Sequence, residues 1–235
     1  MGRIFEVRKS TMFARWDKMA KNFTRIGKEI IIAVKAGGSD PNSNAALRRC
    51  FQNARSVGMP KDRVEAAIKR ASSKDEKDYT EVIYEGYAPH GIPVLVLCAT
   101  DNPTRTVANV RLHFSKNNGS MGNSGSVAFM FEHKGVFKFE LAKLNLDELE
   151  LDLIDAGAED IERGEEEIIL YTKFTDFGQM LKFLEERKLD AKSSELQYIP
   201  TTTKELPENQ QDEVLKLIEA LEGDDDVQSV FHNLA

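Results

Sequence analysis

The spacing of apolar residues changes once along the chain, at the polar and non-periodic stretch 72–78, Ser-Ser-Lys-Asp-Glu-Lys-Asp. Before this stretch, apolar residues recur three and four positions apart, which is typical of amphipathic helices. After it, short apolar runs alternate with helical patterns, which predicts strands interleaved with helices. The sequence therefore predicts a helical unit joined at 72–78 to a region of α+β class.

The sign of the charge changes at the same place. Met1–Ser73 holds 16 Lys and Arg against 6 Asp and Glu, a net of +10, whereas Lys74–Ala235 holds 16 against 33, a net of −17. Because the Debye length at physiological salt is about 8 Å, distant acidic groups barely weaken a basic face at its own surface. We therefore expect the first unit to contact a polyanion and the acidic body to be held clear of it.

Three helices are expected in the first unit. Residues 23–34 carry apolar side chains at helical spacing, and Gly37 ends this helix. A second helix is expected over 44–57, and Pro60 opens a third, since its missing N–H costs nothing at a helix start. Residues 1–21 are expected to form a basic arm, part of it helical.

The Lys and Arg residues of this unit avoid the apolar stripes, so we expect them to be solvated. A face that only keeps helices soluble usually mixes both signs, and the excess of cations favours contact with nucleic acid, although the simpler interpretation stays open. The candidate nucleic-acid-binding residues are Arg3, Arg8, Lys9, Arg15, Lys18, Lys21, Arg25, Lys28, Arg48, Arg49, Arg55, Lys61, Arg63, Lys69 and Arg70.

The acidic body is expected to contain α+β sandwiches of the split βαβ kind, with helices on one face of each sheet. The expected strands are 81–87, 92–100, 126–131, 136–141, 161–163, 167–172, 196–199 and 227–231, and the expected helices are 104–116, 146–156, 174–188 and 208–221.

The sequence contains no recognisable catalytic set. The four histidines lack metal-ligand spacing, and the Gly-rich stretch 117–126 lacks the Gly-Lys-Ser/Thr ending of a phosphate loop. Cys50 and Cys98 lie in apolar segments, which predicts buried reduced thiols and a cytoplasmic protein. The longest apolar run, 92–99, is too short to span a membrane. We expect a binding protein without catalytic residues, metal or cofactor.

Two smaller motifs leave alternatives open. Arg105, in a turn after a strand, could meet a phosphate or form a structural ion pair. The acidic stretch 223–226 could bind a divalent cation, but it lacks the alternating ligands of a calcium loop, which favours a solvated turn.

Several stretches, in order, resemble the YebC/PmpR family. They are Gly37-Gly38-Ser39-Asp40-Pro41, Asn44-Ala45-Ala46-Leu47-Arg48, the run from Met59 to Lys69, Tyr84-Glu85-Gly86-Tyr87-Ala88-Pro89, Thr100-Asp101-Asn102 with Arg105-Thr106, Gly125-Ser126-Val127 with Met130-Phe131, and Asp224-Asp225-Asp226-Val227-Gln228. Each string alone is a weak signal, but the ordered set spans nearly the whole chain.

The resemblance implies three domains: a helical N-terminal domain over 1–78, an α+β domain over 79–133 plus 201–235, and a third, also ferredoxin-like, inserted as 134–200. It implies a DNA-binding transcriptional regulator, with a ribosome-associated translation factor that binds ribosomal RNA and relieves stalling at proline-rich stretches as the alternative. A protein partner for the acidic body is a further expectation, and the oligomeric state is left open.

Overall fold

The computed structural model describes residues 2–73, 78–141 and 144–235, with the side chains of all of these except 2–18 and 147. The chain divides into two compact units, Met1–Tyr79 and Thr80–Ala235. Each unit has its own hydrophobic core, and none of the described helices has the length and hydrophobicity that a bilayer crossing requires.

The first unit contains three helices, α1 (Gly2–Gly37), α2 (Ala45–Ser56) and α3 (Lys61–Ala71). The predicted arm is therefore not separate, because α1 runs without a break from Gly2 through the predicted first helix. It ends where Gly38 adopts a positive φ of 84° and donates its N–H to the carbonyl of Val34 at 2.8 Å. The apolar stripes meet in one core, which includes Ile26, Ile30, Ile31, Val34, Leu47, Cys50, Ala54, Ala67 and Ala71.

Asn44 joins α1 to α2 from the N-cap position of α2. Its side-chain oxygen accepts the N–H of Leu47 at 3.0 Å, and its amide nitrogen donates to the carbonyls of Ala33 at 2.7 Å and Gly38 at 2.8 Å. This buried side chain satisfies backbone groups at the end of one helix and the start of the next, which fixes the turn between them.

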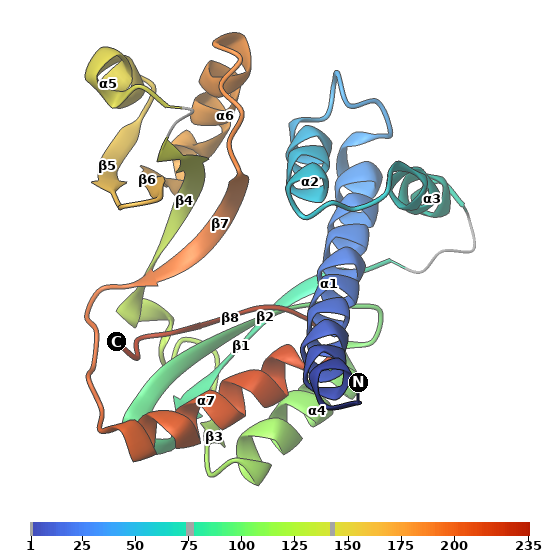
Figure 1. Ribbon diagram of the computed structural model, residues 1–235, viewed down its shortest axis with the longest axis vertical. Coiled ribbons are helices and arrows are strands. Elements are labelled where there is room, and N and C mark those ends of the chain that lie inside the picture. Colours follow the sequence, from blue (N-terminus) through green and yellow to red (C-terminus); the bar gives the residue numbers. More distant parts are fainter. Residues whose placement is uncertain (1, 74–77, 142–143) are drawn as a thin grey trace. The chain divides into compact units, whose positions relative to one another are not determined.

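The second unit begins with a sheet whose strands are antiparallel and lie in the order β3-β1-β2-β8. The elements of this sheet are β1 (Thr80–Ala88), β2 (Ile92–Thr100), α4 (Pro103–Lys116), β3 (Ser120–Met121), α7 (Glu208–Glu222) and β8 (Val227–His232). Helices α4 and α7 pack on one face through Val110, Phe114, Leu217 and Leu221 (Figure 1). The other face of β2 is covered by Val127 and Phe131, which pack on Leu95.

The second sheet of this unit has the antiparallel order β5-β6-β4-β7. Its elements follow in chain order as β4 (Phe131–Glu140), α5 (Leu146–Asp155), β5 (Ala158–Arg163), β6 (Glu167–Lys173), α6 (Phe177–Glu186) and β7 (Ser193–Pro200). Its core lies between the sheet and the two helices, with Phe137, Phe139, Leu153, Leu170 and Met180 fully enclosed.

The predicted strand at 126–131 is wrong. Residues Ala128–Met130 form a 3₁₀ turn, and a single strand, β4, replaces this predicted strand and the one at 136–141. The Gly-rich stretch instead contains the short strand β3, whose Ser120 and Met121 pair with β1. Hydrogen bonds from the backbone N–H groups of Val127 and Ala128 to the distant side chain of Glu85 hold this turn in place.

Candidate nucleic-acid interface

The predicted basic residues fall into groups with different surroundings. Arg3, Arg8, Lys9, Arg15 and Lys18 lie on α1, and their side chains are outside the described part of the structure. Lys21 and Arg25, further along α1, are half-buried and have interaction partners. The remaining positions separate into residues that stabilise the fold and residues that are open to solvent.

Lys28 does not belong to a solvated face, which corrects the expectation from its sequence position. It is only 8% exposed, and its ammonium lies 5.4 Å from the centre of the Tyr79 ring. Tyr79 packs against the core of the helical unit, so it covers a cation that a helical pattern places outside.

Arg48 and Arg49 are also engaged within the unit. Arg48 donates from Nη1 to the carbonyls of Pro41 at 2.7 Å and Asn42 at 3.1 Å, which ties the α1–α2 turn to α2. Arg49 is half-buried beside Cys50. Burial of Cys50 raises the pKa of its thiol to about 12, so this cysteine is an inert part of the core.

Five cationic residues remain exposed in the described part of the helical unit between the end of α2 and the end of α3. They are Arg55, Lys61, Arg63, Lys69 and Arg70. Asp62 and Glu65 are the acidic residues of this segment. Glu65 lies 3.5 Å from Lys61, but an exposed ion pair of this kind contributes little to stability. Arg63 lies 5.5 Å from the centre of the Phe23 ring, which holds its guanidinium near the surface of α1.

Helix electrostatics account for some of these positions but not for others. Arg55, Lys69 and Arg70 occupy last turns, where a cation is favoured by the helix dipole. Lys61 begins α3, where the same dipole disfavours a cation by about 0.3–1 kcal/mol. A phosphate at this helix start would interact favourably with both the ammonium and the free backbone N–H groups.

Arg105 forms a structural ion pair, as one of the two interpretations predicted. Its Nη2 donates to the carboxylates of Asp226 at 2.7 Å and Asp101 at 2.9 Å. Thr106 donates its hydroxyl to the same Asp226 oxygen at 2.8 Å. The acidic stretch at the start of β8 is thus bonded to α4, and among the described residues no group of three or more His, Cys, Asp or Glu is placed to hold a metal ion.

The end of the Gly-rich stretch and the turn that follows it bind a carboxylate of the same chain. The carboxylate of Glu85 accepts backbone N–H groups from Gly125 at 2.6 Å and from Val127 and Ala128 at 2.8 Å each. Burial alone would raise the pKa of Glu85, but these hydrogen bonds stabilise the charged form and the net pKa is lowered. No local sequence pattern predicts this contact, since about forty residues separate its partners.

Comparisons with known proteins agree with this architecture. The family model for the TACO1/YebC N-terminal domain matches residues 3–74, and the model for the TACO1/YebC second and third domain matches residues 79–234. The chain belongs to the TACO1/YebC family. The resemblance stated from the sequence motifs is thereby confirmed.

Relatives of this TACO1/YebC chain match it along its full length. Proteins named "Probable transcriptional regulatory protein" are 59% identical in Anaeromyxobacter dehalogenans and 58% identical in Myxococcus xanthus, each with full coverage of both chains. A protein of the same name from Cytophaga hutchinsonii is 55% identical over all of this chain and 99% of its own. The crystal structure of a conserved hypothetical protein from Aquifex aeolicus is similar, with a TM-score of 0.81, 37% identity, and coverage of 92% of this chain and 90% of that one.

Proposed function

We propose that this protein is a non-catalytic, DNA-binding transcriptional regulator that contacts DNA through its helical unit. The observation that carries the proposal is the group of exposed cations from Arg55 to Arg70, within the stretch Met1–Ser73 whose net charge is +10. The names of the relatives, which are those of probable transcriptional regulators, support the same assignment. The proposal places the protein in the cytoplasm, which fits its two buried cysteines, neither of which forms a disulfide.

The cations would contact phosphates, which gives affinity and position, while sequence preference would come from DNA shape or a few base contacts. If about five phosphates are contacted, affinity for duplex DNA should fall several hundredfold between about 50 and 200 mM salt, from a slope near −0.9 per contact. Lys28 and Arg48 are excluded from this set, because both stabilise the helical unit itself.

The decisive experiment measures binding of a labelled duplex DNA over a range of salt concentrations. Changing Arg55, Lys61 and Lys69 together to Gln should weaken binding and reduce the salt slope by about 2.7 in magnitude, since each lost phosphate contact removes about 0.9. The matched control changes Lys173, Lys182 and Lys192 to Gln, which removes the same charge from exposed positions of the acidic unit. An unchanged slope in the first variant, or an equal loss in the control, would contradict the proposal.

The alternative target, ribosomal RNA, is distinguished by sedimentation of cell lysate through a sucrose gradient. A DNA-binding regulator should remain near the top of the gradient and should protect a promoter fragment from nuclease. Co-sedimentation with ribosomal particles that is lost in high salt would instead favour the translation role.

We also propose the domain division 1–78, 79–133 with 201–235, and an inserted 134–200. The strand memberships support it, because β8 pairs with β2 of the first sheet whereas β4 to β7 form the second. The second sheet follows the β-α-β-β-α-β order of a ferredoxin-like domain. The first sheet begins with two consecutive strands, so we restrict the ferredoxin-like assignment to the inserted domain.

A further inference from the structure

Helix α5 presents apolar side chains on two sides. Leu153 is fully buried and faces the core of the second sheet, whereas Leu151 is 77% exposed and Ile154 is 51% exposed. The two exposed residues are three positions apart, so they are neighbours on one face of the helix. Leu151 has the highest exposed fraction among the large apolar side chains that the structure describes. Contiguous exposed apolar surface, rather than scattered single residues, is what marks contact sites on proteins.

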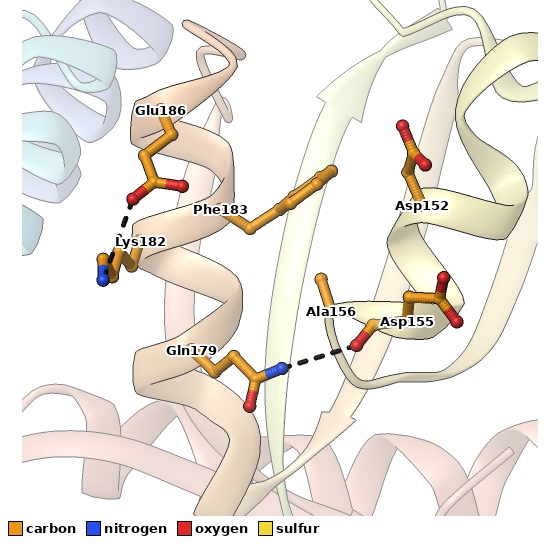
Figure 2. A pocket seen from close by; sticks show the side chains of 7 residues that line it. All are labelled: Asp152, Asp155, Ala156, Gln179, Lys182, Phe183 and Glu186. Atoms are coloured by element: carbon orange, nitrogen blue, oxygen red, sulfur yellow. Dashed lines mark hydrogen bonds and ion pairs between the residues drawn. The ribbon is translucent and has the colours of Figure 1, made fainter.

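A shallow pocket of about 330 Å³ lies between α5 and α6, and its lining residue Asp155 follows Ile154 in the sequence and lies four positions after Leu151. Figure 2 shows Phe183 extending from α6 toward α5, where it forms an apolar wall together with Ala156. Gln179 donates its side-chain amide to the carbonyl of Asp155 at 3.4 Å, which links the two walls. The remaining lining residues are Asp152, Asp155, Lys182 and Glu186.

The pocket is negative, and helix stability does not explain why. The sequence of α5 holds five acidic and no basic residues, and neither α5 nor α6 has a basic residue in its last turn. Carboxylates such as Asp152, Asp155 and Glu186 therefore lie near helix C-termini, where the dipole disfavours each by about 0.3–1 kcal/mol. Two of them have cationic neighbours, since Arg187 donates to Asp152 at 2.7 Å and Lys182 lies 3.8 Å from Glu186 (Figure 2). Both pairs are exposed and contribute little, so the surface keeps its acidic character. The presence of carboxylates at positions where they destabilise their own helices is explained if they attract a cation from a partner.

We propose that this α5–α6 surface, formed by Leu151, Asp152, Ile154, Asp155, Phe183 and Glu186, docks a basic amphipathic segment of a protein partner. Apolar side chains of the partner cover Leu151 and Ile154, and a Lys or Arg enters the pocket. Its charge is attracted to Asp155 and competes with Lys182 for Glu186. Its aliphatic stem shares the Phe183 side chain with Arg187, whose guanidinium lies 5.4 Å from the centre of that ring. The arrangement of an apolar centre with complementary charge at the rim is that of a specific protein interface. The same charge repels a nucleic acid, so the surface is separate from the proposed DNA contact.

The test uses the full chain and a fluorescently labelled synthetic helix with Lys on one face and Leu on the other. The double variant Leu151→Ser and Ile154→Ser should weaken binding of this helix about tenfold or more, as expected for an apolar anchor. The control double variant Leu112→Ser and Leu215→Ser removes exposed leucines of α4 and α7 and should change affinity by less than about twofold.

A second pair of variants tests the charge. Asp155→Asn with Glu186→Gln should weaken binding and flatten its salt dependence, whereas Glu165→Gln with Glu166→Gln, at the exposed turn between β5 and β6, should not. Equal losses in the target and control pairs would mean general attraction to an acidic protein and would overturn the proposal. Failure of the wild-type chain to bind the helix would overturn it as well. Circular dichroism spectra establish that each variant is folded.

Discussion

The structural role of Glu85 could not be predicted from the residues next to it in the sequence. Glu85 lies mid-strand in β1, where a carboxylate would ordinarily face water, yet it is 5% exposed. Its charge organises the turn after the Gly-rich stretch through three backbone N–H groups. That turn carries Val127, which covers one face of β2. A charged side chain therefore positions part of a hydrophobic core.

Replacing Glu85 by Gln should destabilise the second unit by about 2–3 kcal/mol, because charge-assisted bonds to buried N–H groups are lost. Urea denaturation near pH 7 measures this change, with Glu81→Gln on the exposed start of β1 as the control.

The lowered pKa of Glu85 determines how its contribution to stability depends on pH. Its contribution is fully present above the unfolded carboxyl pKa of about 4.3 and is lost as pH falls through the lower folded value. The difference between wild type and variant should therefore shrink in acid. A constant difference down to about pH 2 would show that its charge is not what stabilises the turn.

At the scale of helices and strands, the local pattern was sufficient wherever neighbours in the sequence decide the structure. The second and third helices, β2 and α7 lie close to their predicted bounds. The local sequence pattern gave wrong predictions where contacts with residues distant in the sequence determine the structure. The turn at Ala128–Met130 depends on Glu85, and Lys28 is covered by Tyr79, which follows the polar stretch predicted to join the two units. The charge of α5 was visible in the sequence, but its pocket with α6 required the tertiary structure.

Asn44 offers a test of how the helices of the first unit are joined. Asn44→Ala should destabilise that unit by about 2–3 kcal/mol, which combines the usual cost of a lost N-cap with the lost bonds to the buried carbonyl of Ala33 and the partly buried carbonyl of Gly38. Asn42→Ala, in the same turn but exposed, is the matched control and should cost less than about 1 kcal/mol. Thermal unfolding followed by circular dichroism measures both, and similar losses in the two variants would remove Asn44 from this role.

The whole molecule combines two compact units of opposite net charge, and its proposed chemistry follows from their separation along the chain. The polar stretch and the sign change were both readable in the sequence, and the two compact units divide within a few residues of them. The exposed cations of the proposed DNA contact belong to one unit, and the proposed protein-docking surface belongs to the other. One chain could thus hold a nucleic acid and a basic protein segment at the same time.

This separation predicts that DNA binding and binding of the basic helix can be assigned to separate fragments of the chain. Residues 79–235, which hold the cores of both sheets, should fold when expressed alone and should not be retained on heparin, because this part is acidic. The same fragment should still bind the labelled Lys-Leu helix with the affinity of the full chain. Residues 1–79 should show the reverse behaviour and should keep the salt slope of the full chain on duplex DNA, since phosphate contacts set that slope. Retention of the acidic fragment on heparin would place a cationic surface in the wrong unit, and loss of its affinity for the helix would mean that the helical unit contributes to the docking surface.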